Sequence, residues 1–119
     1  MSPSLQLSEP IADKMTPHQI ITALQSTMNA HDEEGLVALF SRDAFVRDGG
    51  LRYSGLTGIR CWIQDCFERY DLSIKILAVS GENTSWHFEA TVAGNFEGSP
   101  VRLDHYLTIE EGNISSLEI

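Results

Sequence analysis

The stretch MNAHDEEGLVALFSRDAFVRD, residues 28–48, carries the change from helix to strand that decides the fold of this 119-residue chain. It closes a helix that we expect to begin at Thr16, where TPHQ supplies an N-cap, a proline at N1 and a capping-box glutamine. A second, short helix is expected from Asp32, because DEE places acidic residues at the positive end of a helix dipole. The run Ala44–Asp48 then predicts the first strand.

One more helix and a series of strands are expected beyond this stretch. Gly49-Gly50 predicts a hairpin turn into a strand over residues 51–54. Apolar residues spaced i, i+3, i+4, i+7, i+8 and i+11 from Ile59 to Tyr70 predict an amphipathic helix over residues 55–70. The remainder alternates with the period of a strand and is broken by turn residues. The strands expected there are residues 72–80, 84–96, 101–110 and 114–119.

Three helices followed by a long meander predict an α+β fold, in which a curved antiparallel sheet wraps over the helices. Gly94 lies on the apolar face of the strand 84–96, where a missing side chain favours a bend or leaves room for a ligand. A curved sheet closed by helices encloses a cone, and such a cone can hold a small ligand. Residues 1–15, with two prolines and no periodicity, are expected to form a flexible leader before a single domain over residues 16–119.

Composition and short motifs exclude several classes of function. Lys and Arg total 8 against 17 Asp and Glu, a net charge of −9, so nucleic acid and anionic membranes are not expected partners. No apolar run approaches the roughly 18 residues of a membrane span, and no secretory signal is evident, so a cytoplasmic location is expected. Cys61 and Cys66 form neither a disulfide framework nor a zinc motif. No phosphate loop or metal motif occurs, so neither a cofactor nor a metal is expected.

Three segments resemble the nuclear transport factor 2-like (NTF2-like) superfamily: residues 28–48, GLTGIRCWI at 55–63 and VRLDHYLTI at 101–109. Within it they look most like the branch of the ketosteroid isomerases and SnoaL-like polyketide cyclases. The resemblance runs in order over residues 16–119. It implies a cone-shaped α+β barrel, with three N-terminal helices packed in a strongly curved antiparallel sheet. It also implies a homodimer formed through the outer face of the sheet.

The resemblance gives two carboxylates candidate catalytic roles. Asp48 ends the first strand, where ketosteroid isomerases carry their proton-shuttling carboxylate, and Asp104 stands where they carry an acid that hydrogen-bonds the substrate oxygen. Such a pair needs one ionised base and one acid kept protonated by burial. The resemblance therefore implies a cofactor-independent isomerase, cyclase or dehydratase acting on a small apolar carbonyl compound. The alternatives are a turn role for Asp48, an ion pair of Asp104 with Arg102, and a non-catalytic ligand-binding or protein-interaction module.

The chain departs from the isomerase pattern at two positions. Leu24 and Ile63 stand where these enzymes carry tyrosines, so another hydrogen-bond donor has to serve: Tyr53, Tyr106 or Arg102. The full set of expected ligand-binding residues is Leu24, Phe40, Tyr53, Trp62, Ile63, Phe88, Val92, Arg102 and Tyr106.

Alternation on the strand 101–110 separates a polar set (Arg102, Asp104 and Tyr106) from an apolar set on the opposite face. The apolar set would ordinarily face the core. The resemblance implies the reverse, with the polar set lining the cone and the apolar set meeting a partner subunit. The residues expected at the dimer contact are His87, Glu89, Thr91, Leu103, His105, Leu107 and Leu117 or Ile119.

Overall fold

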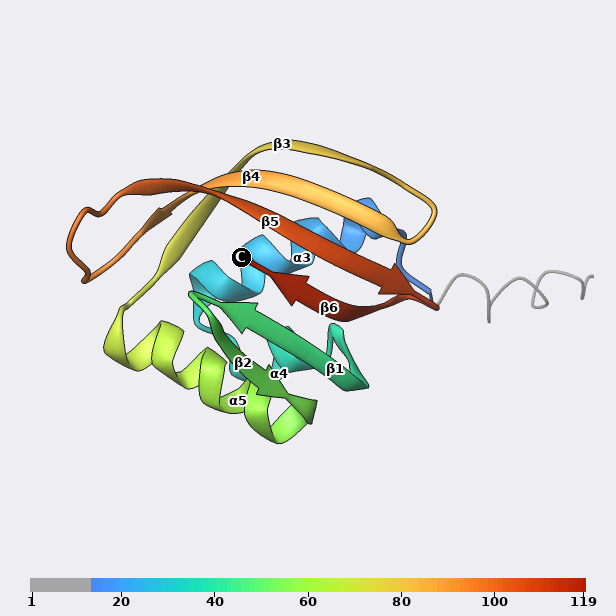
Figure 1. Cartoon of the computed structure of the whole chain (residues 1–119), viewed down its shortest axis with the longest axis horizontal. Helices are drawn as coiled ribbons and strands as arrows, with labels where there is room; N and C mark the ends of the chain where they lie inside the picture. Colours follow the sequence, from blue (N-terminus) through green and yellow to red (C-terminus); the bar gives the residue numbers. More distant parts are fainter. Residues whose placement is uncertain (1–13) are drawn as a thin grey trace, which may run out of the picture.

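Three helices pack inside the curve of one six-stranded sheet in the computed structural model, which describes residues 14–119 (Figure 1). The predicted α+β cone is confirmed; most of the expected leader, residues 1–13, lies outside the described part of the chain. The helices are α3 (Pro17–Ala30), α4 (Glu33–Val37) and α5 (Gly55–Gln64), the last continued by a π-helical turn, η1 (Asp65–Arg69). The strands are β1 (Phe40–Asp48), β2 (Leu51–Ser54), β3 (Ser73–Glu82), β4 (Ser85–Ala93), β5 (Val101–Glu110) and β6 (Asn113–Glu118).

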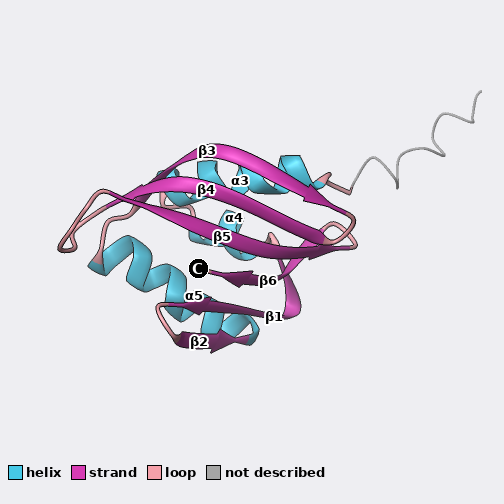
Figure 2. Cartoon of the chain, turned by 45° about the horizontal axis from the view of Figure 1, so that its top comes forward, coloured by secondary structure: helices cyan, strands magenta, loops and turns pink. Residues whose placement is uncertain are grey.

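The sheet has the order β2-β1-β6-β5-β4-β3, and its long strands β3, β4 and β5 arch over α3 (Figure 2). Every neighbouring pair is antiparallel except β1 and β6, which run parallel with Val46 opposite Leu117. The last strand therefore returns to the middle of the sheet and joins the N-terminal hairpin to the meander. This parallel pairing places the end of β1 beside the end of β6, with Arg47 opposite Glu118.

The helix α3 begins and packs as its sequence predicts. The Thr16 side chain accepts a hydrogen bond from the Gln19 backbone N–H at 3.2 Å, and the Gln19 side chain accepts one from the Thr16 N–H at 2.9 Å. Its buried face consists of Ile20, Ile21, Leu24 and Met28. The 3.6-residue period thus turns one apolar stripe towards the sheet, whose β4 contributes the buried residues Phe88, Ala90 and Val92.

Side chains of α3 also cover the free edge of the sheet at β3. The Asn29 side chain donates to the Ile74 carbonyl at 2.9 Å and accepts from the Ile74 N–H at 2.7 Å. The Gln25 side chain accepts from the Ile76 N–H at 2.7 Å. Since unpaired backbone groups on an edge strand invite pairing with other chains, these bonds both fix the helix and protect the edge.

A π-helical turn ends the third helix, where the sequence predicts an unbroken α-helix to residue 70. The turn widens the helix after Gln64 and is followed by Tyr70, whose carbonyl accepts a hydrogen bond from the Asn95 N–H at 2.7 Å. A Cβ atom on Gly94 would lie 2.5 Å from the Tyr70 carbonyl oxygen. Glycine at this position therefore permits the close approach of the end of the helix to the strand connection.

No helix within residues 14–119 combines the length and the hydropathy that crossing a membrane would require.

Candidate active site

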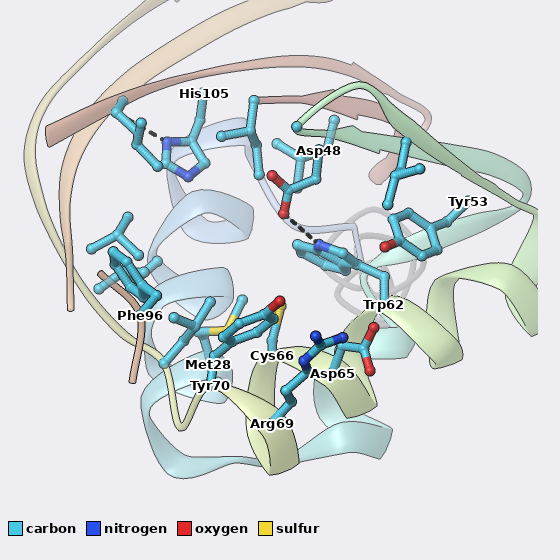
Figure 3. A pocket seen from close by; sticks show the side chains of 18 of the residues that line it. Met28, Asp48, Tyr53, Trp62, Asp65, Cys66, Arg69, Tyr70, Phe96 and His105 are labelled. Atoms are coloured by element: carbon cyan, nitrogen blue, oxygen red, sulfur yellow. Dashed lines mark hydrogen bonds between the residues drawn. The ribbon is translucent and has the colours of Figure 1, made fainter. Parts of the chain in front are cut away.

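A pocket of about 420 Å³ lies inside the cone, between α3, α5 with η1, and the inner face of the sheet (Figure 3). Most of its wall is apolar, and two exposed leucines, Leu51 and Leu103, mark where it meets solvent. The other apolar and aromatic lining residues are Leu24, Met28, Tyr53, Trp62, Cys66, Tyr70, Leu72, Ile74, Val92, Phe96, Val101, Leu117 and Ile119.

Asp48 places a carboxylate in this apolar wall. It is the last residue of β1 and half-buried, and the indole Nε1 of Trp62 donates a hydrogen bond to its Oδ2 at 3.0 Å (Figure 3). Trp62 is itself buried on the inner side of α5 and packs edge-on against Phe40. The carboxylate is therefore oriented by a side chain that has little freedom to move. A carboxylate held in this way can accept and return a proton.

His105 adds an imidazole to the pocket wall. Only 4% of the residue is exposed, and its ring stacks on Phe88 with centroids 4.4 Å apart. Its Nδ1 lies 3.2 Å from the Leu103 carbonyl oxygen (Figure 3). Burial lowers the pKa of His105 to about 4, because the apolar surroundings disfavour the charged ring. The imidazole is therefore neutral at pH 7.

Two weaker acids of the wall remain protonated. Burial raises the pKa of Tyr53 above its ordinary value, and the nearby carboxylates of Asp65 and Asp48 raise it further. Burial raises the pKa of Cys66 to about 12, so this residue holds a thiol and not a nucleophilic thiolate. Tyr53 can consequently donate a hydrogen bond from its hydroxyl to a ligand at neutral pH.

The π-helical turn contributes charged groups to the same wall. Asp65 and Arg69 both line the pocket, and the Arg69 guanidinium lies 5.2 Å from the centre of the Tyr70 ring. Within the described residues, Arg69 is the one lysine or arginine of the lining, and it is exposed. The interior of the pocket thus offers no buried positive charge among these residues, which favours a neutral ligand over an anion.

The structure brings together only part of the predicted site. Asp48, Leu24, Tyr53, Trp62 and Val92 line the pocket. Three predicted ligand contacts, Phe40, Ile63 and Phe88, are buried core residues that do not line it. The remaining predicted site residues, Asp104, Arg102 and Tyr106, lie exposed on the other face of β5.

The expectation that the polar face of β5 lines the cone is therefore wrong. Asp104 pairs on the outer face with His87 at 2.9 Å, and Arg102 pairs with Glu89 at 3.1 Å. The opposite set, Val101, Leu103 and His105, lines the pocket, while Leu107 is buried deeper. Burial of apolar side chains decides the face, because exposing them to water in order to bury an arginine and an aspartate would cost free energy twice.

The inward direction of the apolar face of β5 also corrects the predicted dimer contact. Leu103, His105, Leu107, Leu117 and Ile119 belong to the inner side of the sheet, as pocket lining or core. Only His87, Glu89 and Thr91 of that set alternate outward from the buried face of β4. The apolar outer row that motivated the prediction therefore does not exist within the described residues. The homodimer itself stays a prediction.

Several residues of the site are not among those predicted from the sequence, and His105 matters most among them. The alternation of β5 does indicate its inward direction, since it shares a face with Leu103 and Leu107. Asp65, Arg69 and the ring of Tyr70 were missed as pocket residues because the π-helical turn changes which side of the helix faces the cone. Within residues 14–119, no group of three or more His, Cys, Asp or Glu side chains is arranged to hold a metal ion.

Comparison with solved structures identifies the architecture as an NTF2-like cone. A candidate polyketide cyclase from Sinorhizobium meliloti is 29% identical, with a TM-score of 0.80 over 83% of this chain and 91% of that one. A protein with a ketosteroid isomerase-like fold from Catenulispora acidiphila, in complex with trimethylamine, is 21% identical, with a TM-score of 0.73 over 87% and 85%. A candidate ketosteroid isomerase from Kribbella flavida is 16% identical, with a TM-score of 0.69 over 83% and 72%.

The family follows from the sequence match that accompanies this fold. The model of the SnoaL-like domain matches residues 21–117, and the chain belongs to this family. No match was found among the curated proteins. The two neighbours below 25% identity support the fold alone.

Proposed function

We propose that this protein binds a small apolar carbonyl compound in the pocket of the cone and catalyses a cofactor-independent proton transfer on it, as an isomerase, cyclase or lyase. Asp48 is the proton shuttle of this reaction. The observation that carries the proposal is the Asp48 carboxylate, which is fixed by Trp62 at 3.0 Å in the wall of an otherwise apolar pocket of about 420 Å³. Membership of the SnoaL-like family and the likeness to a candidate polyketide cyclase support it.

The chemistry requires a base and a donor on the same ligand. Asp48 removes a proton from the carbon next to the carbonyl group, which leaves an enolate, and then returns the proton at the same or another carbon. The enolate oxygen needs a hydrogen-bond donor, and the protonated Tyr53 hydroxyl is a lining group that can supply one. This assignment replaces Asp104, which lies on the outer face.

A non-catalytic ligand-binding protein on the same fold is the second candidate. It is favoured by one observation: Asp104, the acid that the resemblance assigns as the partner of Asp48, does not share the pocket with it. In that case Asp48 would serve recognition only, through a hydrogen bond from the ligand.

Deuterium exchange separates the two candidates without knowledge of the natural substrate. A panel of small cyclic ketones and enones is incubated with the protein in deuterated buffer, and loss of the α-proton signals is followed by NMR. The proposal predicts accelerated exchange for the ketones that bind, and a fall of about 10²- to 10⁴-fold in Asp48→Asn. The matched control is Asp43→Asn, an exposed carboxylate on the same strand, which should exchange like the unchanged protein.

Two results would contradict the proton-transfer function. Binding of ketones without any accelerated exchange would favour the non-catalytic protein. Exchange that persists in Asp48→Asn would show that another group moves the proton.

A further inference from the structure

His105 presents a polar atom to the pocket that nothing in the described chain satisfies. The residue is 96% buried, since 4% of it is exposed, and its ring lies at the cavity wall. One ring nitrogen, Nδ1, is directed to the Leu103 carbonyl, and Figure 3 shows the other ring nitrogen turned towards the cavity. No group within residues 14–119 forms a hydrogen bond with that second nitrogen, Nε2. Buried polar atoms are normally paired, so an unpaired one at a cavity wall indicates a binding partner.

The hydrogen bond at Nδ1 fixes which kind of partner Nε2 can take. Nδ1 lies 3.2 Å from the Leu103 carbonyl oxygen, and because a carbonyl oxygen only accepts hydrogen bonds, Nδ1 carries the proton. The ring is neutral at pH 7, so Nε2 then has a free lone pair and no proton. It can accept a hydrogen bond but cannot donate one. A ketone or ether oxygen placed against it would leave two acceptors facing each other.

We propose that the ligand of this pocket carries a hydroxyl or N–H group on its apolar body and donates a hydrogen bond from it to Nε2 of His105. The inference rests on the proposed function, since it concerns the compound bound at the same site, and it narrows the substrate class to hydroxylated or N–H-bearing carbonyl compounds. The carbonyl end lies towards Asp48 and Tyr53, and the donor end lies towards β5. The contacts at its carbonyl end and the hydrogen bond at its donor end thereby fix the orientation of the ligand.

Desolvation keeps the His105 ring neutral against the pull of the nearby carboxylates. On the pocket side, Asp48 of β1 favours the protonated ring. From the outer face of the sheet, Asp104 favours the protonated ring and His87 opposes it. Desolvation outweighs all of these, because Phe88 covers the ring on the β4 side. Nε2 of His105 therefore keeps its free lone pair at pH 7.

A matched pair of probes tests directly whether the pocket prefers a hydrogen-bond donor over an acceptor. 2-Naphthol carries a hydroxyl donor, whereas 2-methoxynaphthalene has nearly the same shape and offers only an acceptor. Both are small compared with a pocket of about 420 Å³. Calorimetric titration at pH 7 should show 2-naphthol binding about tenfold more tightly, the usual effect of one hydrogen bond to a buried partner.

Variants then assign the preference to one residue. His105→Phe keeps the aromatic stack on Phe88 and removes the acceptor, so the two probes should bind it about equally. His105→Gln places an amide oxygen near the position of Nε2 and should keep part of the preference. Asp48→Asn should leave the preference in place, which shows that the hydroxyl is not held by the carboxylate.

A measurement on the unaltered protein covers the case in which a variant fails to fold. In ¹⁵N-labelled protein, the resonance of the unprotonated Nε2 of His105 should move when 2-naphthol is added and stay in place with 2-methoxynaphthalene. Equal binding of both probes with an unmoved Nε2 resonance would overturn the inference and leave the proposed function standing. A preference that survives His105→Phe, or that disappears in Asp48→Asn, would also overturn it. If neither probe binds while ketones of the panel do, the inference is overturned and the proposed function stands. If no ketone of the panel binds either, the proposed function is overturned with it.

Discussion

The indole of Trp62 and the carboxylate of Asp48 are joined by a hydrogen bond of 3.0 Å that ties helix α5 to the end of strand β1. The bond occupies one carboxylate oxygen, Oδ2, and fixes the plane of the group at the pocket wall (Figure 3). The second oxygen has no hydrogen-bond partner within residues 14–119 and is available to a ligand. The proposed acid–base role of Asp48 requires an orientation that is set before the substrate arrives, and Trp62 supplies that orientation.

Replacement of Trp62 tests this positioning role. Trp62→Phe keeps an aromatic ring against Phe40 but removes the N–H donor, so the carboxylate of Asp48 can rotate. We expect deuterium exchange to fall by about tenfold, less than in Asp48→Asn, while probe binding changes by no more than about threefold. A purely structural role would instead weaken binding and exchange together, which the paired measurement distinguishes.

Neutral His105 makes the folding stability depend on pH. Its pKa falls from 6.5 to about 4 on folding, so the unfolded chain binds the proton more tightly, and stability is lost as pH falls from 6.5 towards 4. The contribution of neutral His105 to the free energy of unfolding falls by about 2 kcal/mol between pH 7 and pH 5. The free energy of unfolding can be measured with urea at pH 7 and at pH 5. Between these pH values it should fall by about 2 kcal/mol less in His105→Phe than in the unchanged protein. Equal losses would mean that the ring is not buried in its neutral form. The charged or titratable neighbours Asp48, Asp104 and His87 are the same in both proteins, so the comparison isolates the imidazole.

The link between α3 and the edge strand should be a large local contribution to stability. Asn29→Ala removes two hydrogen bonds to the backbone of Ile74, at 2.9 and 2.7 Å, and leaves that N–H and carbonyl without their partner. We expect the free energy of unfolding to fall by about 2 kcal/mol. Thr22→Ala, an exposed change on the same helix, is the control and should stay within about 0.5 kcal/mol of the unchanged protein. A loss equal to that of the control would contradict the role given to Asn29.

Asp104 should not be needed for ligand binding or proton exchange in the pocket. Asp104→Asn weakens the exposed pair with His87, at 2.9 Å, and we expect probe binding and deuterium exchange to remain unchanged. Stability should shift by no more than about 0.5 kcal/mol, as is usual for an exposed ion pair. A fall in exchange comparable with that of Asp48→Asn would restore the catalytic role that the family resemblance assigns to Asp104.

The helical part of the fold and the strand pattern were predictable because each follows from a local rule. The capping box at Thr16 and the apolar stripe of α3 are present as expected, and so is the inward face of β4 through Phe88 and Val92. The parallel pairing of β1 with β6 and the π-helical turn were not predicted, since neither leaves a periodic signal in the sequence. Both depend on packing between distant segments.

The site was only half predictable, for a different reason. Asp48 was found through the resemblance and its place at the end of a strand, and it does line the pocket. On β5, the resemblance and the alternation disagree: the resemblance assigns Asp104 to the pocket, whereas the alternation turns His105 inward. The apolar residues Leu103 and Leu107 share their face with His105, so the burial rule alone would have identified the inward-facing residues. A family position predicts a role only when the register of the strand agrees with it.

The proposed function and the proposed hydrogen bond to His105 both require a ligand inside the cone, between Asp48 and His105, so mapping where a ligand binds tests both together. 2-Naphthol is titrated into isotopically labelled protein, and NMR resonances of the side chains are followed. We expect saturable shifts at the Trp62 Nε1–H, the Asp48 carboxyl carbon and the His105 ring, with the Asp104 carboxyl and the His87 ring unchanged. Saturable shifts confined to Asp104 and His87 on the outer face, or the absence of shifts at Trp62, Asp48 and His105, would contradict it.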